Sequence, residues 1–132
     1  MAERRRGPRR ESGAAVVDFV LVMLVVIPLV LGIMQVALVM HVRNVTTAAA
    51  AEGARTQAAL DAAPGAGEER TRSQIDTGIG GHFVRAVSVR PATVAGVPGV
   101  EVTVVSEVPA LGLLGPGMTV EVTGHAVREV AP

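Results

Sequence analysis

An acidic residue stands at the head of the longest apolar stretch of the chain. Asp18 immediately precedes 22 residues, 19–40, that carry no charge. An ionised carboxylate beside hydrocarbon is unfavourable, so it needs a cationic partner or a position near the membrane interface. We therefore interpret Asp18 as a candidate intramembrane charge partner. The alternative is that Asp18 simply sits in the first turns of its helix, where the helix dipole and Arg9 or Arg10 favour a negative charge.

Few other residues have the types and spacing that catalysis requires. The three histidines, His41, His82 and His125, are far apart in the sequence and lack metal-ligand spacing. The chain has no cysteine, which excludes disulfides, thiolate zinc sites and cysteine nucleophiles. It also lacks a phosphate-binding loop and a serine elbow. We expect a protein that is not an enzyme, with no cofactor, no bound metal and no small-molecule substrate.

Composition narrows the class of partner. Apolar residues make up 49% of the 132 residues and charged residues 18%, an unusually apolar balance for a small soluble protein. Twelve basic residues balance twelve acidic ones, so the formal net charge is zero. This balance argues against nucleic acid as a partner, whereas the apolar excess points to membrane lipid.

The apolar stretch is long enough to cross a bilayer. As a helix, residues 19–40 would extend about 33 Å, against a hydrocarbon core of about 30 Å. Five arginines precede the stretch, and only His41 and Arg43 follow it closely. The positive-inside rule then predicts a single-pass inner-membrane protein with a cytoplasmic N-terminus and residues 41–132 outside. A cleaved secretory signal is the competing interpretation, with residues 48–50 as the cleavage site and an exported chain beginning near Ala51.

The elements that must position these residues follow from periodicity. Residues 1–13 form a basic cytoplasmic leader, residues 14–63 a long helix that contains the span, and residues 64–132 a small extracytoplasmic domain. A second helix is expected at about residues 68–78. Alternating apolar residues predict strands at 100–108 and 118–126, with a fainter strand at 83–90. The predicted fold class is α+β, a long N-terminal transmembrane helix joined to a three-stranded antiparallel sheet.

The start of the long helix resembles the prepilin family. In that family a membrane peptidase cuts after a glycine, and an acidic residue five positions later neutralises the new amino terminus of a neighbouring subunit. Gly13 and Asp18 have this spacing, so the resemblance implies processing between Gly13 and Ala14 by a prepilin peptidase. The family usually has glutamate at the acidic position, and Asp18 is one methylene shorter. A retained leader on an uncleaved anchor is the alternative.

Further segments are similar to the TadE family, small membrane proteins of tight-adherence (Flp-type) pilus assembly. These segments are residues 14–21, 28–33, 50–55 and 122–129. The resemblance implies a pseudopilin-like structural or assembly component of a Flp-type (Tad) pilus or related secretion apparatus. Its partners would be other pilin-like or Tad secretion-system proteins. The alternative function is an anchor whose external domain binds an envelope partner without entering a filament.

The most specific of these segments contains Glu52, Gly53 and Arg55. Glu52 and Arg55 are three residues apart, so they lie on one helix face and can form an ion pair. Such a surface pair contributes a few tenths of a kcal/mol at most to stability. We therefore favour a plain surface ion pair over a contact surface for the sheet or for a partner. Gly53 is unfavourable within a helix, which suggests a close approach of a strand or another helix at this point.

Overall fold

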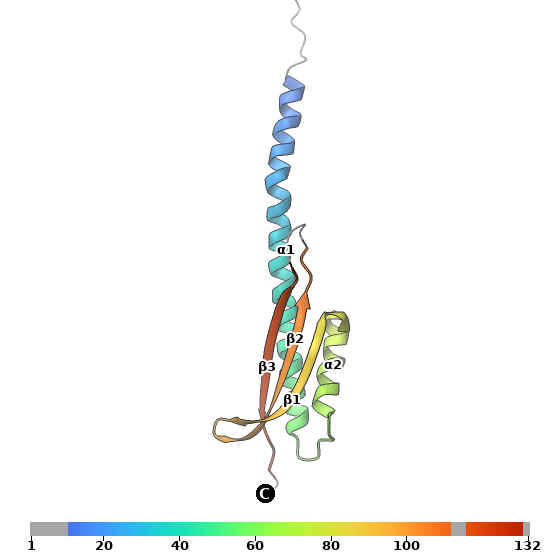
Figure 1. Cartoon of the computed structure of the whole chain (residues 1–132), viewed down its shortest axis with the longest axis vertical. Coiled ribbons are helices and arrows are strands. Elements are labelled where there is room, and N and C mark those ends of the chain that lie inside the picture. Colours follow the sequence, from blue (N-terminus) through green and yellow to red (C-terminus); the bar gives the residue numbers. More distant parts are fainter. Residues whose placement is uncertain (1–10, 112–115, 131–132) are drawn as a thin grey trace, which may run out of the picture.

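The computed structural model describes residues 11–111 and 116–130 and contains one very long helix beside a small sheet. Figure 1 shows helix α1, Glu11–Ala58, running the length of the molecule, with the other elements gathered around its second half. Helix α2 is Ala66–Ile79 and a short 3-10 turn is Gly81–Phe83. The strands are β1, Val84–Val94; β2, Val97–Val108; and β3, Met118–Val127. The predicted α+β fold with a three-stranded sheet is confirmed.

The first half of α1 stands clear of the rest of the protein. From Gly13 onward, the first buried side chain along this helix is Val42. The large apolar side chains before it are mostly half exposed or more, as Phe19, Leu24 and Leu29 are. After Val42 the helix turns one face to the sheet and buries alanines there, including Ala49, Ala50 and Ala54. We call the folded part, residues 42–58 of α1 with α2 and the sheet, the head.

The sheet is an antiparallel meander with β2 in the centre. Its inner face carries the predicted alternation, because Val100, Val102, Val104 and Val108 of β2 are all buried. Ser106 occupies the same face and is also buried. Met118, which the alternation places inside, is instead 51% exposed, because it begins β3 at the rim of the sheet.

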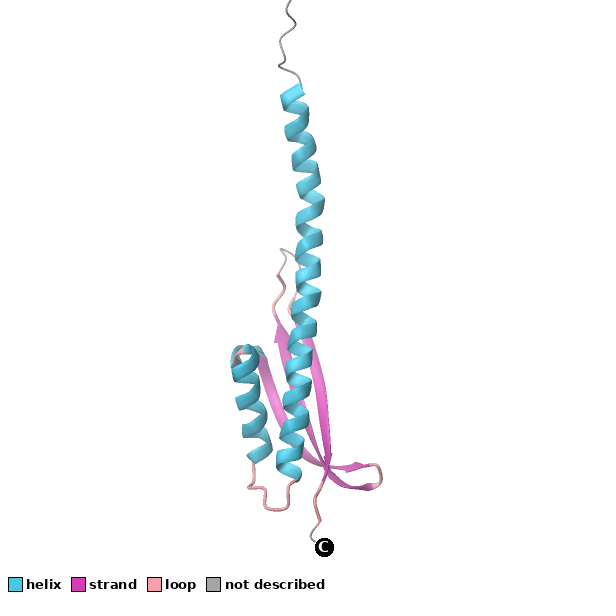
Figure 2. Ribbon diagram, turned by 180° about the vertical axis from the view of Figure 1, so that it is seen from behind, coloured by secondary structure: helices cyan, strands magenta, loops and turns pink. Residues whose placement is uncertain are grey.

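Both helices cover one face of the sheet. Figure 2 shows α1 and α2 side by side in front of the strands. α1 packs on β2 and β3, while α2 packs on α1 and more lightly on β1. Among the described residues, Ile75 of α2 is the largest fully buried side chain. Alanine and valine make up the rest of the buried apolar core, so the two layers lie close together.

The two largest differences from the predicted boundaries are at the ends of α1 and β1. α1 ends at Ala58 rather than near Ala63. The chain after β3 caps this end, since the backbone N–H of Glu129 donates to the Ala58 carbonyl at 2.9 Å. Strand β1 continues through Pro91 to Val94, where the sequence predicted a stop at the proline. β1 is an edge strand, and a proline at an edge removes no hydrogen bond that the sheet needs.

Candidate functional site

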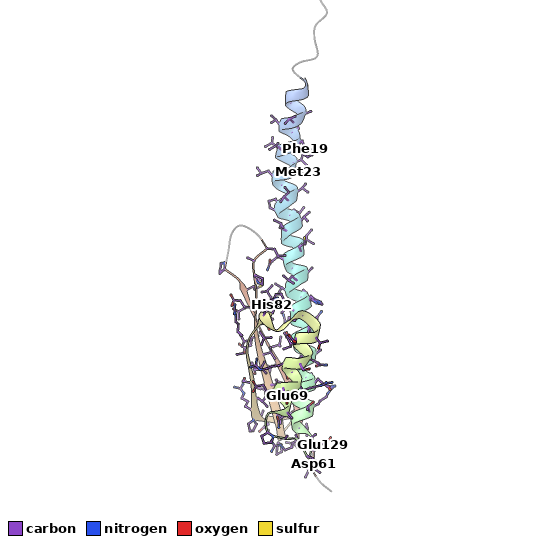
Figure 3. The ribbon with its side chains drawn as sticks, turned by 90° about the vertical axis from the view of Figure 1, so that its right-hand side faces the viewer. Phe19, Met23, Asp61, Glu69, His82 and Glu129 are labelled. Atoms are coloured by element: carbon purple, nitrogen blue, oxygen red, sulfur yellow. The ribbon has the colours of Figure 1, made fainter. Side chains whose placement is uncertain are left out.

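The exposed first half of α1 is the most unusual surface of the protein. Residues 13–58 form a helix that is long and apolar enough to cross a membrane, and its most apolar part has a mean hydropathy of 2.9 with none of it buried. Figure 3 shows the side chains of this part, Phe19 and Met23 among them, projecting from a helix with no neighbour. Exposed apolar surface of this extent marks a contact with lipid or with other apolar helices.

The candidate processing site and Asp18 lie at the outer end of this helix. Gly13 and Ala14 are in its first turn and exposed, and open space surrounds Gly13. Asp18 is also exposed, and the ion pairs among the described residues do not include it. Most of the predicted leader, residues 1–10, lies outside the described part of the chain. The five-residue spacing therefore places Gly13 and Asp18 on one exposed helix end, far from the head.

A shallow apolar hollow lies further along the exposed helix. It has a volume of about 550 Å³ and is lined by Pro28, Leu29, Gly32, Ile33, Val36 and Ala37. A Cβ added to Gly32 would meet no atom within 4 Å. Small residues within an apolar helix allow another helix to approach closely.

Helices α1 and α2 approach each other closely at Gly53, a point that we call the helix crossing. A Cβ on Gly53 would lie 2.6 Å from the carbonyl oxygen of Gly67 and would also collide with the hydroxyl of Thr71. Thr71 is fully buried and its hydroxyl donates to the Gly67 carbonyl at 2.8 Å. Nearby, the side-chain oxygen of Gln57 accepts from the Gly67 N–H at 3.0 Å. The close approach predicted for Gly53 is thus an approach of helix α2, which starts at this crossing.

Glu52 and Arg55 sit on the exposed side of the same crossing. Their charged atoms are 4.0 Å apart, and a second arginine, Arg70 of α2, reaches Glu52 at 3.5 Å. The arginine side chains are 75% and 50% exposed, so water weakens both pairs. The sequence predicted the first pair, while the second links α1 to α2 and depends on the tertiary fold.

Gln35 is a site residue that sequence reasoning missed. Its side chain holds the start of the β2–β3 connection: the amide nitrogen donates to the Pro109 carbonyl at 3.3 Å, and the amide oxygen accepts from the Leu111 N–H at 2.7 Å. We call this pair of hydrogen bonds the Gln35 clamp. The available signal was that Gln35 is the one clearly polar residue among the 22 of the predicted span.

A row of charges crosses the outer face of the sheet. Arg90, Glu101 and His125 face one another on β1, β2 and β3. Arg90 forms an ion pair with Glu101, and His125 Nε2 lies 2.9 Å from the other carboxylate oxygen. Hydrogen bonds from His125 and then Arg90 lower the pKa of Glu101 below its ordinary value. A second pair, Arg85 with Glu107 at 2.7 Å, lies on the same face.

The histidines do not come together into a site. His41 is on α1, the ring of His82 lies beside that of Phe83 in the 3-10 turn at a tilted angle, and His125 belongs to the charge row. Within residues 11–111 and 116–130, no three side chains of the metal-binding types lie close enough to hold an ion. A groove of about 610 Å³ runs along α2 and reaches the start of β1. It is lined mainly by charged and small residues: Gly65, Glu68, Glu69, Arg72, Ser73, Asp76, Gly81 and Val84.

Comparison with known proteins finds a family similarity over most of helix α1. The family model of TadE-like proteins matches residues 13–55, which are 43 of the 132 residues. No curated protein and no solved structure matches the chain. The matched region begins at the candidate processing glycine, contains the whole exposed part of α1, and ends at Arg55 beside the helix crossing. Residues 13–55 are therefore similar to TadE-like proteins, as the resemblance of segments 14–21, 28–33 and 50–55 predicted, whereas the match does not extend to residues 122–129.

Proposed function

We propose that this chain is a pseudopilin-like structural component of a Flp-type (Tad) pilus or related secretion apparatus. One observation carries the proposal: the TadE-like match covers an apolar helix whose first half is almost entirely unburied. The family implies a part in pilus assembly, and a helix with this much exposed apolar surface needs a lipid or helical environment. The role is a structural one, with other pilin-like or Tad secretion-system proteins as partners.

This role assigns a location to each part of the chain. Residues 1–13 are a basic cytoplasmic leader, residues 14–63 contain the anchor, and residues 64–132 complete an extracytoplasmic domain. The arginine excess before the span orients the chain in the inner membrane with its N-terminus in the cytoplasm. Lateral contacts with neighbouring helices use the hollow around Gly32, where no side chain blocks a close approach.

Removal of the gene tests the role directly. A deletion strain should lose surface filaments and filament-dependent adhesion, and the wild-type gene should restore both. The variant Gly32→Ile, which fills the hollow, should restore them poorly. Its matched control is Met34→Ile, an exposed position of the same helix that does not line the hollow. Normal piliation in the deletion strain would refute the proposal.

Processing is a separate question with its own measurement. We propose that a prepilin peptidase cuts between Gly13 and Ala14, because the glycine, the apolar helix and Asp18 follow the prepilin order. The intact mass of the protein extracted from membranes should correspond to a chain that begins at Ala14. A mass that includes the leader would instead favour the second candidate, an uncleaved anchor whose head binds an envelope partner. The charged outer face of the sheet would then be its contact surface.

A further inference from the structure

We infer that the start of the β2–β3 connection, residues 109–111, lies in the outer leaflet of the membrane and contacts lipid. The Gln35 clamp holds this segment beside the exposed part of α1. Figure 1 shows the chain after β2 continuing along α1 beyond the end of the strand. The inference rests on the helix spanning a bilayer with the head outside, as proposed above, and does not depend on any role in a pilus.

Distances along α1 place the clamp at membrane depth. Asp18 and Gln35 are 17 residues apart, which is about 25 Å along a helix. A hydrocarbon core of about 30 Å that begins beside Asp18 therefore ends beyond Gln35. Tilting the helix would bring Gln35 further inside. The first polar residues that follow, His41 and Arg43, are exposed and lie about 9–12 Å further toward the head, at headgroup level.

The Gln35 clamp supplies hydrogen-bond partners for backbone groups of residues 109–111, as backbone in hydrocarbon requires. Irregular backbone is costly in hydrocarbon because its polar groups find no water there. Pro109 has no N–H, and its carbonyl accepts a hydrogen bond from Gln35. The N–H of Leu111 donates to the same side chain. One amide therefore satisfies the two ends of the segment, which explains why a polar residue stands inside the apolar helix.

The surface around the clamp is apolar. Leu111 is 39% exposed although its backbone is held against α1, and the neighbouring Val36 is 64% exposed. This surface is continuous with the exposed apolar side of the span. At this depth, lipid acyl chains are the partner that matches the exposed apolar side chains of Leu111 and Val36. The opposite end of the head offers the contrast, because the β1–β2 turn at residues 95–96 lies far from the exposed part of α1 (Figure 2).

Fluorescence quenching by lipid tests the inference in the full chain. The protein has no tryptophan or tyrosine, so a single introduced tryptophan is the only strong emitter. The variant Leu111→Trp would be reconstituted in phosphatidylcholine vesicles with or without bromine on the acyl chains. Val30→Trp, in the span, is the positive control. Val97→Trp is the negative control, since Val97 is 42% exposed at the far end of the head.

We expect brominated lipid to quench Val30→Trp strongly, Leu111→Trp clearly and Val97→Trp not at all. Bromines near the headgroup end of the acyl chain should quench Leu111→Trp more than bromines near its tail. Adding Gln35→Leu should reduce the quenching of Leu111→Trp at least twofold, whereas the neighbouring Met34→Leu should leave it unchanged. If brominated lipid quenches Leu111→Trp no more than Val97→Trp while it quenches Val30→Trp, the inference is overturned. If it does not quench Val30→Trp, the helix does not span the bilayer, and the inference is overturned as well.

Thiol labelling of single-cysteine variants tests the same inference without the bulky tryptophan side chain. The chain has no cysteine, so Leu111→Cys and Val97→Cys each carry a single thiol. In intact vesicles a membrane-impermeant maleimide should label the outward-facing molecules of Leu111→Cys several-fold more slowly than those of Val97→Cys. Detergent should remove the difference. Equal labelling rates before detergent would contradict a lipid-embedded segment.

Discussion

Gly124 of β3 lies directly against the backbone of Ala50 in α1. A Cβ placed on Gly124 would be 2.5 Å from the Ala50 carbonyl oxygen and equally close to the amide nitrogen of Ala51. These are backbone atoms of a helix and cannot move aside as a side chain would. The absence of a side chain at one position of β3 therefore sets the distance between helix and sheet.

The variant Gly124→Ala should destabilise the head because it forces α1 away from β3. Overpacking of this kind costs about 2 kcal/mol. Chemical unfolding of the detergent-solubilised protein, followed by circular dichroism, measures the loss. Gly32→Ala is the matched control, since a Cβ at Gly32 meets nothing within 4 Å. A loss no greater than that of the control would show that the sheet shifts without difficulty.

Substitution at the helix crossing should separate α2 from α1. In Gly53→Ala a gain in helix propensity of about 1 kcal/mol opposes the clash with Thr71 and the Gly67 carbonyl. Because the carbonyl belongs to the α2 backbone, we expect the clash to win, with a net loss of about 1–2 kcal/mol. Hydrogen exchange should increase in α2 before the sheet responds. Adding Thr71→Ala should not restore stability, since the collision with the carbonyl persists; full rescue would disprove this account.

The sequence predicted the features that depend on local rules. Residues 19–40 carry no charge and are apolar apart from Gln35, and a stretch of this length predicts a helix that can span a bilayer. The alternation Val100, Val102, Val104 predicted the buried face of β2, because a strand has a period of two. Gly53 was flagged because a helical glycine is unfavourable unless something needs the space.

Contacts between distant residues could not be predicted in this way. Gly124 and Ala50 meet only because of the register between α1 and β3, and a glycine in a strand does not reveal which backbone approaches it. Gln35 and Leu111 are 76 residues apart, and their hydrogen bond depends on the position along α1 at which the sheet packs. Pro91 predicted a strand end because sequence alone does not show that β1 is an edge strand.

Stability of the head should fall in acid through Glu101. Its pKa is lowered in the folded protein by His125 and Arg90, relative to an ordinary value of 4.5. A lowered folded pKa stabilises the protein above the unfolded pKa, and this contribution disappears as the pH falls through the folded pKa. Unfolding midpoints measured below pH 5 should therefore decrease more steeply for wild type than for Glu101→Gln. Glu121→Gln, on the same sheet but outside the described ion pairs, should follow wild type. Parallel curves for wild type and Glu101→Gln would contradict the assignment.

Asp18 should matter for assembly and not for folding. It is exposed on the protruding helix, far from the head, so Asp18→Asn should leave the unfolding midpoint unchanged. A carboxylate in a poorly hydrated setting is retained where it meets a positive charge, and the proposed partner is the amino terminus of a neighbouring processed subunit. Loss of a pair that contributes about 1.4 kcal/mol per subunit would weaken subunit association about tenfold. Filament yield per cell should fall accordingly in Asp18→Asn and recover in Asp18→Glu, which restores the charge. Normal yield in Asp18→Asn, with equal protein in the membrane, would show that the carboxylate only marks the end of the span.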